Sequence, residues 1–405
     1  MLIVEMLSTG DEVLHGQIID TNAAWLADCF FDEGFPLSSR ATVGDNLDSL
    51  VNVLRERSQH ADILIVNGGL GPTSDDLSSL AAATAACVPL VEHAQWIAVM
   101  ERYFLARGRV MPETNRKQAL LPEGAELVDN PVGTACGFSM ILNDCWLFFT
   151  PGVPSEFKVM VQEQILPCLR ERYPVIEAPL CLRLTSFGRS ESSLAKQFDS
   201  LSLPEGCVLG YRSSMPIIEI KLTGPASQKA AMLEVWQTIK VGVGENFIFE
   251  GTEGLPHIIC RQLNEKCLRV AISEEFTAGL LSWTLNSVFA PVNGGKSINQ
   301  QQEQQLGALI KRANDIATQE DAQIGLAIGG YQSGCLSVAL RTPEKCYAQC
   351  VRYMPNNHDT KIKQEVSVML ILNMLQRWLQ GRNVFCEYEW LDQIEYLEVE
   401  SSSCE

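Results

Sequence analysis

The sequence predicts an α/β protein that begins with a doubly wound parallel sheet. Strand and helix patterns alternate through the first 172 residues. The strands are near-continuous apolar runs, which is typical of parallel strands covered by helices on both faces. Beyond that point the elements become shorter and then lengthen again. We therefore expect three domains: a doubly wound domain over residues 1–172, a small α+β domain over 173–250, and an α/β domain over 251–405.

The first domain reads as a series of β-α-β units. Leu47, Leu50, Val51 and Leu54 recur at helical spacing, so the segment 45–59 is predicted as an amphipathic helix. The same reasoning predicts strands at 2–9, 36–44, 62–69 and 145–154, and helices at 20–34, 45–59, 74–87 and 155–173. Strands that alternate with helices in this way lie parallel in one sheet.

The remaining two domains have different element patterns. The small domain is predicted to hold strands at 180–188, 206–212 and 217–224 and helices near 190–200 and 226–241. The last domain is predicted to contain helices at about 255 onward, 279–288, 306–317 and 362–378, with strands at 269–275, 324–330 and 335–340. Both are mixtures of helix and strand, without an internal repeat.

The bulk composition excludes several classes of function. The net charge is -18 and basic residues form no block, so we expect no nucleic-acid partner. No apolar stretch reaches the roughly 20 residues that span a bilayer, so we expect no membrane partner. The 14 cysteines are scattered and form no C-x-x-C pair, which favours reduced thiols. A cytoplasmic location follows from this reading.

Four loops follow predicted strands and share one composition. They are "STGDE" (8–12), "VGDN" (43–46), "NGGLGPTSDD" (67–76) and "TPGVPSEFK" (150–158), and each contains glycine and an acid. In open α/β sheets, ligands bind beyond the carboxyl ends of the strands. The four loops therefore predict one ligand site.

The chemistry of these loops favours a phosphate that arrives with a metal ion. Gly68, Gly69 and Gly71 would let the backbone approach a phosphate closely. Carboxylates nearby would repel that phosphate unless a divalent cation bridged the two. Taken singly, the aspartates have a simpler explanation, because acids in a first helical turn stabilise the helix. Their convergence at neighbouring strand ends favours the nucleotide site.

The first domain resembles the amino-terminal domain of the CinA family. The resemblance rests on "STGDEVLHGQIIDTNAAWLA", "VGDNLDSL", "NGGLGPTSDDL", "NPVGTACGF" and "TPGVPSEFKVM". That domain is similar to the molybdopterin-binding domains of MogA and MoeA. The resemblance implies a metal-dependent ADP-ribose pyrophosphatase that releases AMP and ribose 5-phosphate. It also implies a Mg, Mn or Co ion, a small-molecule nucleotide substrate and a homodimer.

Particular residues take on roles through this resemblance. The implied catalytic residues are Asp45, Asp75 and Asp76, and the implied metal ligands are Asp11 and Asp76. The implied phosphate- and nucleotide-binding residues are Gly10, Gly68, Gly69, Gly71, Thr73, Asn115, Lys117, Asn130, Gly133, Thr134, Glu156 and Lys158. Which aspartate acts as base and which as ligand stays open.

The small domain resembles the KH-like linking domain of full-length CinA proteins. The resemblance rests on "GRSESSLAKQF" and "LGYRSSMPIIEIKLTG". A KH fold suggests RNA binding, but no G-x-x-G clamp with basic flanks is present. We expect a spacer or a dimer element.

The last domain resembles the CinA carboxyl-terminal domain, which is similar to nicotinamide mononucleotide deamidases. The family signature A-E-S-C-T-G-G aligns with "SEEFTAG" (273–279), where Glu274 and Thr277 match. Glu275 stands in place of the serine nucleophile, and a carboxylate cannot replace an activated hydroxyl in amide cleavage. Two later family segments are also replaced, by "APVNGGKSINQQQEQQLG" and "GGYQSG". We therefore predict a degenerate deamidase site, with Ser273 in a shifted register as the alternative.

Three hypotheses of function follow. The leading one is hydrolysis of ADP-ribose or a related nucleotide by the first domain. The second is deamidation of nicotinamide mononucleotide by the last domain. The third is a nucleotide-binding scaffold without catalysis.

Overall fold

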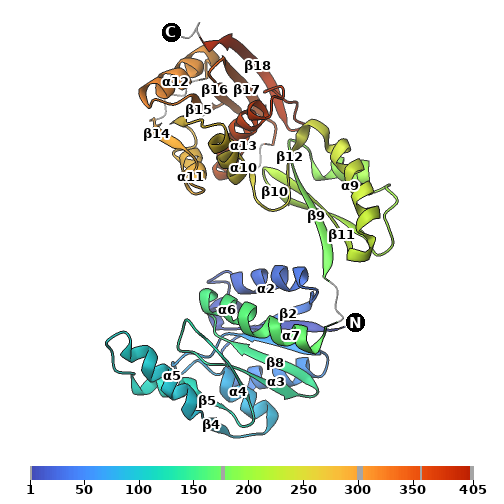
Figure 1. Ribbon diagram of the computed structural model, residues 1–405, viewed down its shortest axis with the longest axis vertical. Helices are drawn as coiled ribbons and strands as arrows, with labels where there is room; N and C mark the ends of the chain where they lie inside the picture. The colour runs from blue at the N-terminus through green and yellow to red at the C-terminus, as the bar shows by residue number, and fades with distance from the viewer. Residues whose placement is uncertain (1, 175–177, 299–303, 356–357, 402–405) are drawn as a thin grey trace. The chain divides into compact units, whose positions relative to one another are not determined.

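The computed structural model describes residues 2–174, 178–298, 304–355 and 358–401 (Figure 1). The chain divides into two compact units, Met1–Pro179 and Leu180–Glu405.

The first unit is built on a six-stranded sheet with the order β2-β1-β3-β8-β7-β6. The strands are β1 (Val4–Thr9), β2 (Leu37–Val43), β3 (Ile63–Asn67), β6 (Glu126–Val128), β7 (Gly137–Leu142) and β8 (Cys145–Thr150). Strands β2, β1, β3 and β8 are mutually parallel, as the apolar runs predicted. The prediction of a wholly parallel sheet was wrong at one side, because β7 and β6 add to β8 as antiparallel strands. A tight turn at Asn143 and Asp144 joins β7 directly to β8, and strands so joined must run antiparallel.

Helices cover both faces of this sheet, because the strand side chains alternate between the faces. Leu7, Leu64 and Val66 pack with residues of α3 (Leu47–Ser58), α4 (Ser78–Ala86) and α5 (Ala94–Leu105). Met6, Ile63 and Ile65 pack with α2 (Thr21–Asp32), α6 (Pro154–Met160) and α7 (Leu166–Arg172) on the opposite face (Figure 1). The doubly covered arrangement predicted for the central strands is therefore confirmed.

Shorter elements complete the first unit. They are α1 (Asp11–Leu14), a hairpin of β4 (Leu90–Glu92) and β5 (Leu120–Pro122), a 3-10 turn at Glu113–Ala119 and a π-helical turn at Val161–Ile165. The helix predicted from residue 74 begins at Ser78 instead. Asp75 and Asp76 therefore lie in the loop before α4 and not in its first turn, which removes the simple helix-dipole explanation for them.

The second unit contains two sheets. The smaller has the order β10-β11-β9-β12, formed by β9 (Pro179–Phe187), β10 (Val208–Ser214), β11 (Ile217–Pro225) and β12 (Phe247–Glu250). Helices α8 (Glu191–Phe198) and α9 (Lys229–Val243) supply Leu194, Phe198, Met232 and Trp236 to a core with the alternating residues of β11. The α+β character predicted for this segment is confirmed.

The larger sheet has the order β14-β13-β15-β16-β17-β18. Its strands are β13 (Val270–Glu274), β14 (Val292–Ser297), β15 (Ile324–Gln332), β16 (Cys335–Arg341), β17 (Lys345–Tyr353) and β18 (Leu391–Glu400). Its helices are α10 (Leu255–Glu265), α11 (Leu280–Asn286), α12 (Leu306–Gln319) and α13 (Thr360–Leu379). Only β13, β14 and β15 are parallel, and the sequence did not predict β14, β17 or β18.

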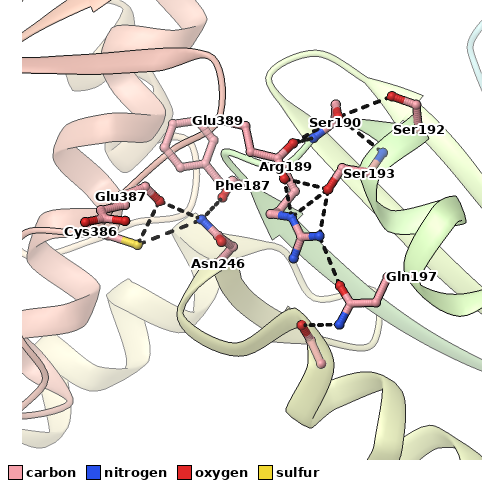
Figure 2. Close-up of polar contacts among 11 residues, drawn as sticks. Phe187, Arg189, Ser190, Ser192, Ser193, Gln197, Asn246, Cys386, Glu387 and Glu389 are labelled. Carbon is pink, nitrogen blue, oxygen red and sulfur yellow. Dashed lines mark hydrogen bonds and ion pairs between the residues drawn. The ribbon is translucent and has the colours of Figure 1, made fainter.

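A short segment between α13 and β18 joins the two sheets of the second unit. We name residues 386–390 the strap. The Glu389 carboxylate accepts hydrogen bonds from Arg189 Nε at 2.7 Å and from Ser190 N and Oγ at 2.9 Å, at the start of α8 (Figure 2). Asn246 Nδ2 donates to the carbonyls of Phe187 and Glu387. The residues of 180–250 and 251–405 are therefore fastened by charged and neutral hydrogen bonds.

The helices and the cysteines of the described ranges bear on the membrane and disulfide expectations. Among the residues described, no helix is long and apolar enough to cross a membrane. Every cysteine in the described ranges is free of a disulfide, as the scattered spacing predicted.

Candidate active site

A cavity of about 520 Å³ lies at the carboxyl ends of the parallel strands in the first unit. The loops after β1, β2, β3 and β8 surround it, which is the place predicted from their composition. The predicted site residues that line it are Gly10, Asp45, Gly68, Gly69, Gly71, Asp75, Asp76, Thr134 and Glu156.

The glycine loop is required by contacts within the chain. Gly68 has φ +113°, and a Cβ there would lie 2.6 Å from Thr9 Oγ1. Gly69 has φ +68°, and a Cβ there would lie 2.3 Å from Ser78 Oγ. Ser78 Oγ also donates to the carbonyl of Gly68 at 2.8 Å. The loop is therefore packed between the end of β1 and the start of α4, in a conformation that only glycine adopts without strain.

The carboxylates of Asp11 and Asp45 each accept a hydrogen bond from the backbone N–H of the other residue. Asp11 N donates to Asp45 Oδ2 at 3.0 Å, and Asp45 N donates to Asp11 Oδ1 at 3.2 Å. Asp45 lines the cavity, whereas Asp11 is not among the lining residues. Burial raises the pKa of Asp45 above its ordinary value, and the charges of Asp11, Glu12 and Asp75 raise it further, although the hydrogen bond from Asp11 N opposes part of this rise. A cation in the cavity would relieve this repulsion.

Asp76 shapes the loop that precedes α4. Its Oδ2 accepts hydrogen bonds from Thr73 N at 2.9 Å and from the Thr73 hydroxyl. A Cβ on Gly71 would lie 2.4 Å from the same oxygen, so the loop folds tightly around this carboxylate. Asp75 lines the cavity from the adjacent position and is exposed.

Glu156 is positioned by a buried asparagine. Asn130 Nδ2 donates to Glu156 Oε2 at 2.7 Å, and Asn130 Oδ1 accepts from Gly133 N at 3.0 Å. A Cβ on Gly133 would lie 2.2 Å from the Glu156 carboxyl group, so a larger residue at 133 would displace this carboxylate. The carbonyl of Thr134 accepts from Trp96 Nε1 at 3.1 Å. Asn130 and Gly133 therefore do not line the cavity themselves but support Glu156, which does.

Other predicted binding residues lie away from the cavity. Asn115 is buried and donates to Gln118 Oε1 at 2.9 Å. The Lys117 ammonium donates to the carbonyl of Thr73, and both residues line a separate hollow beside the glycine loop. The Lys158 ammonium lies 5.6 Å from the centre of the Trp25 ring. The structure does not bring these residues into the cavity lining.

Several polar residues of the cavity were missed in the sequence analysis. Asn67, at the end of β3, donates to the carbonyl of Pro151 at 2.7 Å, and Asn22 donates to Asn67 Oδ1 at 3.0 Å and to the carbonyl of Gly152 at 2.8 Å. This amide pair ties β3, α2 and the end of β8 together. Glu12 and Asp20 also line the cavity. Their signal was present, because each stands in a polar loop after a strand.

The charge of the cavity bears on the expected metal ion. Six carboxylates line it, from Glu12, Asp20, Asp45, Asp75, Asp76 and Glu156, and none of its described lining residues is Lys, Arg or His. Within the described ranges these acids form no cluster of three that could hold a metal by itself. Mg²⁺ usually binds one or two carboxylates and completes its shell with substrate phosphates and water. The oxygen donors here fit a cation of that kind.

The segment predicted as a degenerate deamidase site is saturated by internal partners. Glu274 is buried and accepts from Leu281 N and Ser282 N at 2.8 Å and from Thr277 Oγ1 at 2.7 Å, at the start of α11. The Glu275 side chain is fully buried and pairs with Arg312 Nη1 at 3.1 Å. Arg312 Nη2 donates to Ser273 Oγ at 3.1 Å, so Ser273 belongs to the same buried network.

Comparisons with known proteins extend these observations. Residues 5–171 match the family described as "Probable molybdopterin binding domain". A CinA-like protein of Escherichia coli O17:K52:H18 is 56% identical over 99% of this chain and 100% of its own length. The "NMN amidohydrolase-like protein YfaY" of Escherichia coli K12 is 56% identical over 98% of both chains. The solved structure of CinA from Thermoplasma acidophilum, of unknown function, is 26% identical and covers 40% of this chain and 96% of its own, with a TM-score of 0.37.

The match to the E. coli relatives is not confined to the cavity or to one unit. It extends through the first unit, the strap and the segment 273–279 alike. Because 56% identity holds over nearly the full length of both proteins, this chain belongs to the CinA-like protein family.

Proposed function

We propose that the first unit hydrolyses the pyrophosphate bond of ADP-ribose, or of a related nucleotide, with a divalent cation. The observation that carries this proposal is the cavity at the strand ends, which is lined by six carboxylates and by no basic residue in its described lining. Such a cavity repels a bare pyrophosphate and accepts one whose charge a cation neutralises. Its volume of about 520 Å³ lies in the range of small-ligand sites.

The proposed reaction is attack of water on one phosphorus of the pyrophosphate. The bond from that phosphorus to the bridging oxygen breaks, and the products are AMP and ribose 5-phosphate. A bound Mg, Mn or Co ion would supply charge neutralisation at the phosphoryl oxygens. Asp45 is the candidate acceptor of the water proton, because its raised pKa makes its carboxylate a stronger base. Asp11 positions Asp45, and Asn130 positions Glu156.

The test uses the full chain with ADP-ribose and Mg²⁺, Mn²⁺ or Co²⁺, with AMP release as the readout. Asp45→Asn is expected to lower the rate by about 100-fold or more, the usual contribution of a general base. Asp48→Asn is the matched control, because Asp48 is an exposed acid in α3 that does not line the cavity. Equal rates in both variants would contradict the role of Asp45. Tight ADP-ribose binding without turnover would favour the nucleotide-binding scaffold.

The name of the E. coli K12 relative raises nicotinamide mononucleotide deamidation as a second candidate. The buried network at 273–279 opposes it, because Glu275 stands at the nucleophile position and its carboxylate is held by Arg312. We expect no ammonia release from nicotinamide mononucleotide. Ammonia release that disappears in Ser273→Ala would overturn this expectation and favour the shifted register.

A further inference from the structure

The wall of the cavity has an apolar part that the proposed hydrolysis does not use. Val13, Ile18 and Ile19, between β1 and α2, line the cavity together with Val153, after β8. We name these four residues the apolar rim. Ile18, Ile19 and Val153 are 52%, 87% and 49% exposed. Single exposed apolar residues are ordinary, but several at one cavity indicate a surface that a ligand covers.

The loop that carries the two isoleucines is fixed. Gln17 N and Ile18 N donate to the carbonyl of Glu12 at 2.8 Å and 3.2 Å, and Thr21 N donates to the carbonyl of Ile19 at 2.8 Å. Asp20 accepts from Ser8 Oγ at 2.5 Å and from Ala23 N at 2.8 Å, where it caps α2. These bonds hold residues 17–21 on both sides of the isoleucines. Their exposure is therefore a built feature of the cavity mouth.

The chemistry of the two parts of the wall matches the two parts of a nucleotide. Carboxylates such as Asp45 and Asp75 suit a phosphate that carries a cation. Branched aliphatic side chains offer no hydrogen bonds to phosphate or to sugar hydroxyls, but they pack well against the flat apolar faces of a nucleobase. We infer, on the basis of the proposed function, that the apolar rim binds the nucleobase. The substrate is then a nucleotide, and neither a sugar phosphate nor inorganic pyrophosphate contains all that the cavity recognises.

The experiment measures binding and not hydrolysis. The full chain with Mg²⁺ is titrated by calorimetry with AMP, with ribose 5-phosphate and with inorganic pyrophosphate. The double variant Ile18→Asn, Ile19→Asn is compared with Val110→Asn, because Val110 is 92% exposed in the same unit and does not line the cavity. We expect the double variant to raise the Kd of AMP about tenfold, which corresponds to about 1.4 kcal/mol. The Kd of pyrophosphate and of ribose 5-phosphate should change less than about twofold in either variant.

Four results would overturn the inference. They are failure of the wild-type chain to bind AMP, an unchanged Kd of AMP in the double variant, an equal loss for all three ligands, and a change of assembly state in sedimentation without a change in AMP binding. The last result would assign the rim to a contact between copies of the chain. A selective loss of AMP binding in a protein that does not hydrolyse ADP-ribose would support the rim and overturn only the proposed function. Hydrolysis with unchanged AMP binding would do the reverse.

Discussion

The acidic residues of the cavity and those of segment 273–279 differ in exposure, because the first group lines an open cavity whereas Glu274 and Glu275 are buried. In the cavity, six carboxylates face one open space, and Asp45 has a raised pKa because burial and its acidic neighbours oppose its charge. In the second unit, Glu274 and Glu275 are buried, and their oxygens take donors from α11 and from Arg312. Carboxylates saturated by the protein's own donors stabilise the fold. Carboxylates that repel one another around a cavity cost stability and retain capacity for an external cation.

We expect the largest loss in the free energy of unfolding from removing one of the two buried carboxylates, that of Glu275. Glu275→Ala removes a fully buried carboxylate that pairs with the mostly buried Arg312 guanidinium at 3.1 Å. Breaking a buried pair on one side usually costs about 3–5 kcal/mol. Denaturant unfolding of the full chain should show this loss in the transition of the second unit. Asp75→Ala in the cavity is the paired control and should change the free energy of unfolding by less than about 0.5 kcal/mol. Equal losses would remove the distinction between the two groups.

A smaller effect is expected at Glu274. In Glu274→Gln the side chain keeps its size, but an NH₂ group replaces one carboxylate oxygen and faces the backbone N–H of Leu281 or of Ser282, each of which donates to a different oxygen of Glu274. The loss should be about 2–3 kcal/mol, the usual value for hydrogen bonds to a buried charged group. Glu265→Gln, at an exposed site at the end of α10, should leave the same unfolding transition unchanged. A loss of similar size in the free energy of unfolding of Glu265→Gln would show that the effect is not specific to Glu274.

The strap offers an intermediate case, because Glu389 is saturated by donors yet partly exposed. Burial raises its pKa, but the bonds from Ser193, Ser190 and Arg189 outweigh this and leave the pKa of Glu389 below its ordinary value. Its stabilisation is therefore present above the ordinary pKa and is lost as the pH falls through the lowered one. Glu389→Gln should lower stability by about 1–2 kcal/mol near neutral pH, an amount reduced by solvent screening. Melting curves of both proteins should converge once the pH has fallen below the lowered pKa of Glu389, because the carboxyl group is then protonated in folded and unfolded chains alike.

The control for the strap is Glu387→Gln, because Glu387 is exposed in the same segment. It should melt like the unchanged chain at every pH. A difference between Glu389→Gln and the unchanged chain that persists at acid pH would contradict the electrostatic explanation for the strap.

The smallest expected change in stability is a gain, and it is expected from replacing Asp45 in the cavity. Because the pKa of Asp45 is raised in the folded protein, its ionisation costs stability as the pH rises through that pKa. Asp45→Asn should therefore stabilise the metal-free protein at neutral pH, by up to about 1 kcal/mol. The gain should vanish below the ordinary pKa of aspartate, about 3.9, where the carboxyl is protonated in folded and unfolded chains alike. Added Mg²⁺ should raise the melting temperature of the unchanged chain more than that of Asp45→Asn. If Asp45→Asn were less stable than the unchanged chain, the Asp45 carboxylate would stabilise the fold, as those of Glu274 and Glu275 do.

Much of the cavity could be predicted from the sequence because its signals are local. Apolar runs specify β1, β3 and β8, and the polar, glycine-containing loops after them specify the edge where a ligand binds. The loops at Gly68, Asp45 and Glu156 were located in this way. The roles within the loops were harder to predict, because Asp11 and Asn130 turn out to hold other residues in place. Whether a side chain faces the cavity or supports a neighbour depends on packing between loops far apart in the chain.

The sequence by itself determined the order of most helices and of the central strands and the loop composition of the cavity. The family resemblance added the expectation that Glu275 stands in place of a serine nucleophile. Only the tertiary structure decided that β7 and β6 join the first sheet as antiparallel strands. It also decided that β17 and β18 pair with each other although α13 lies between them in the sequence. It also decided that Glu275 meets Arg312, 37 residues away, and that Glu389 meets Ser190, 199 residues away. Hydrophobic periodicity records which face of an element is buried. It carries no record of which distant side chain supplies the hydrogen bond, because that partner is set by how the packed elements meet.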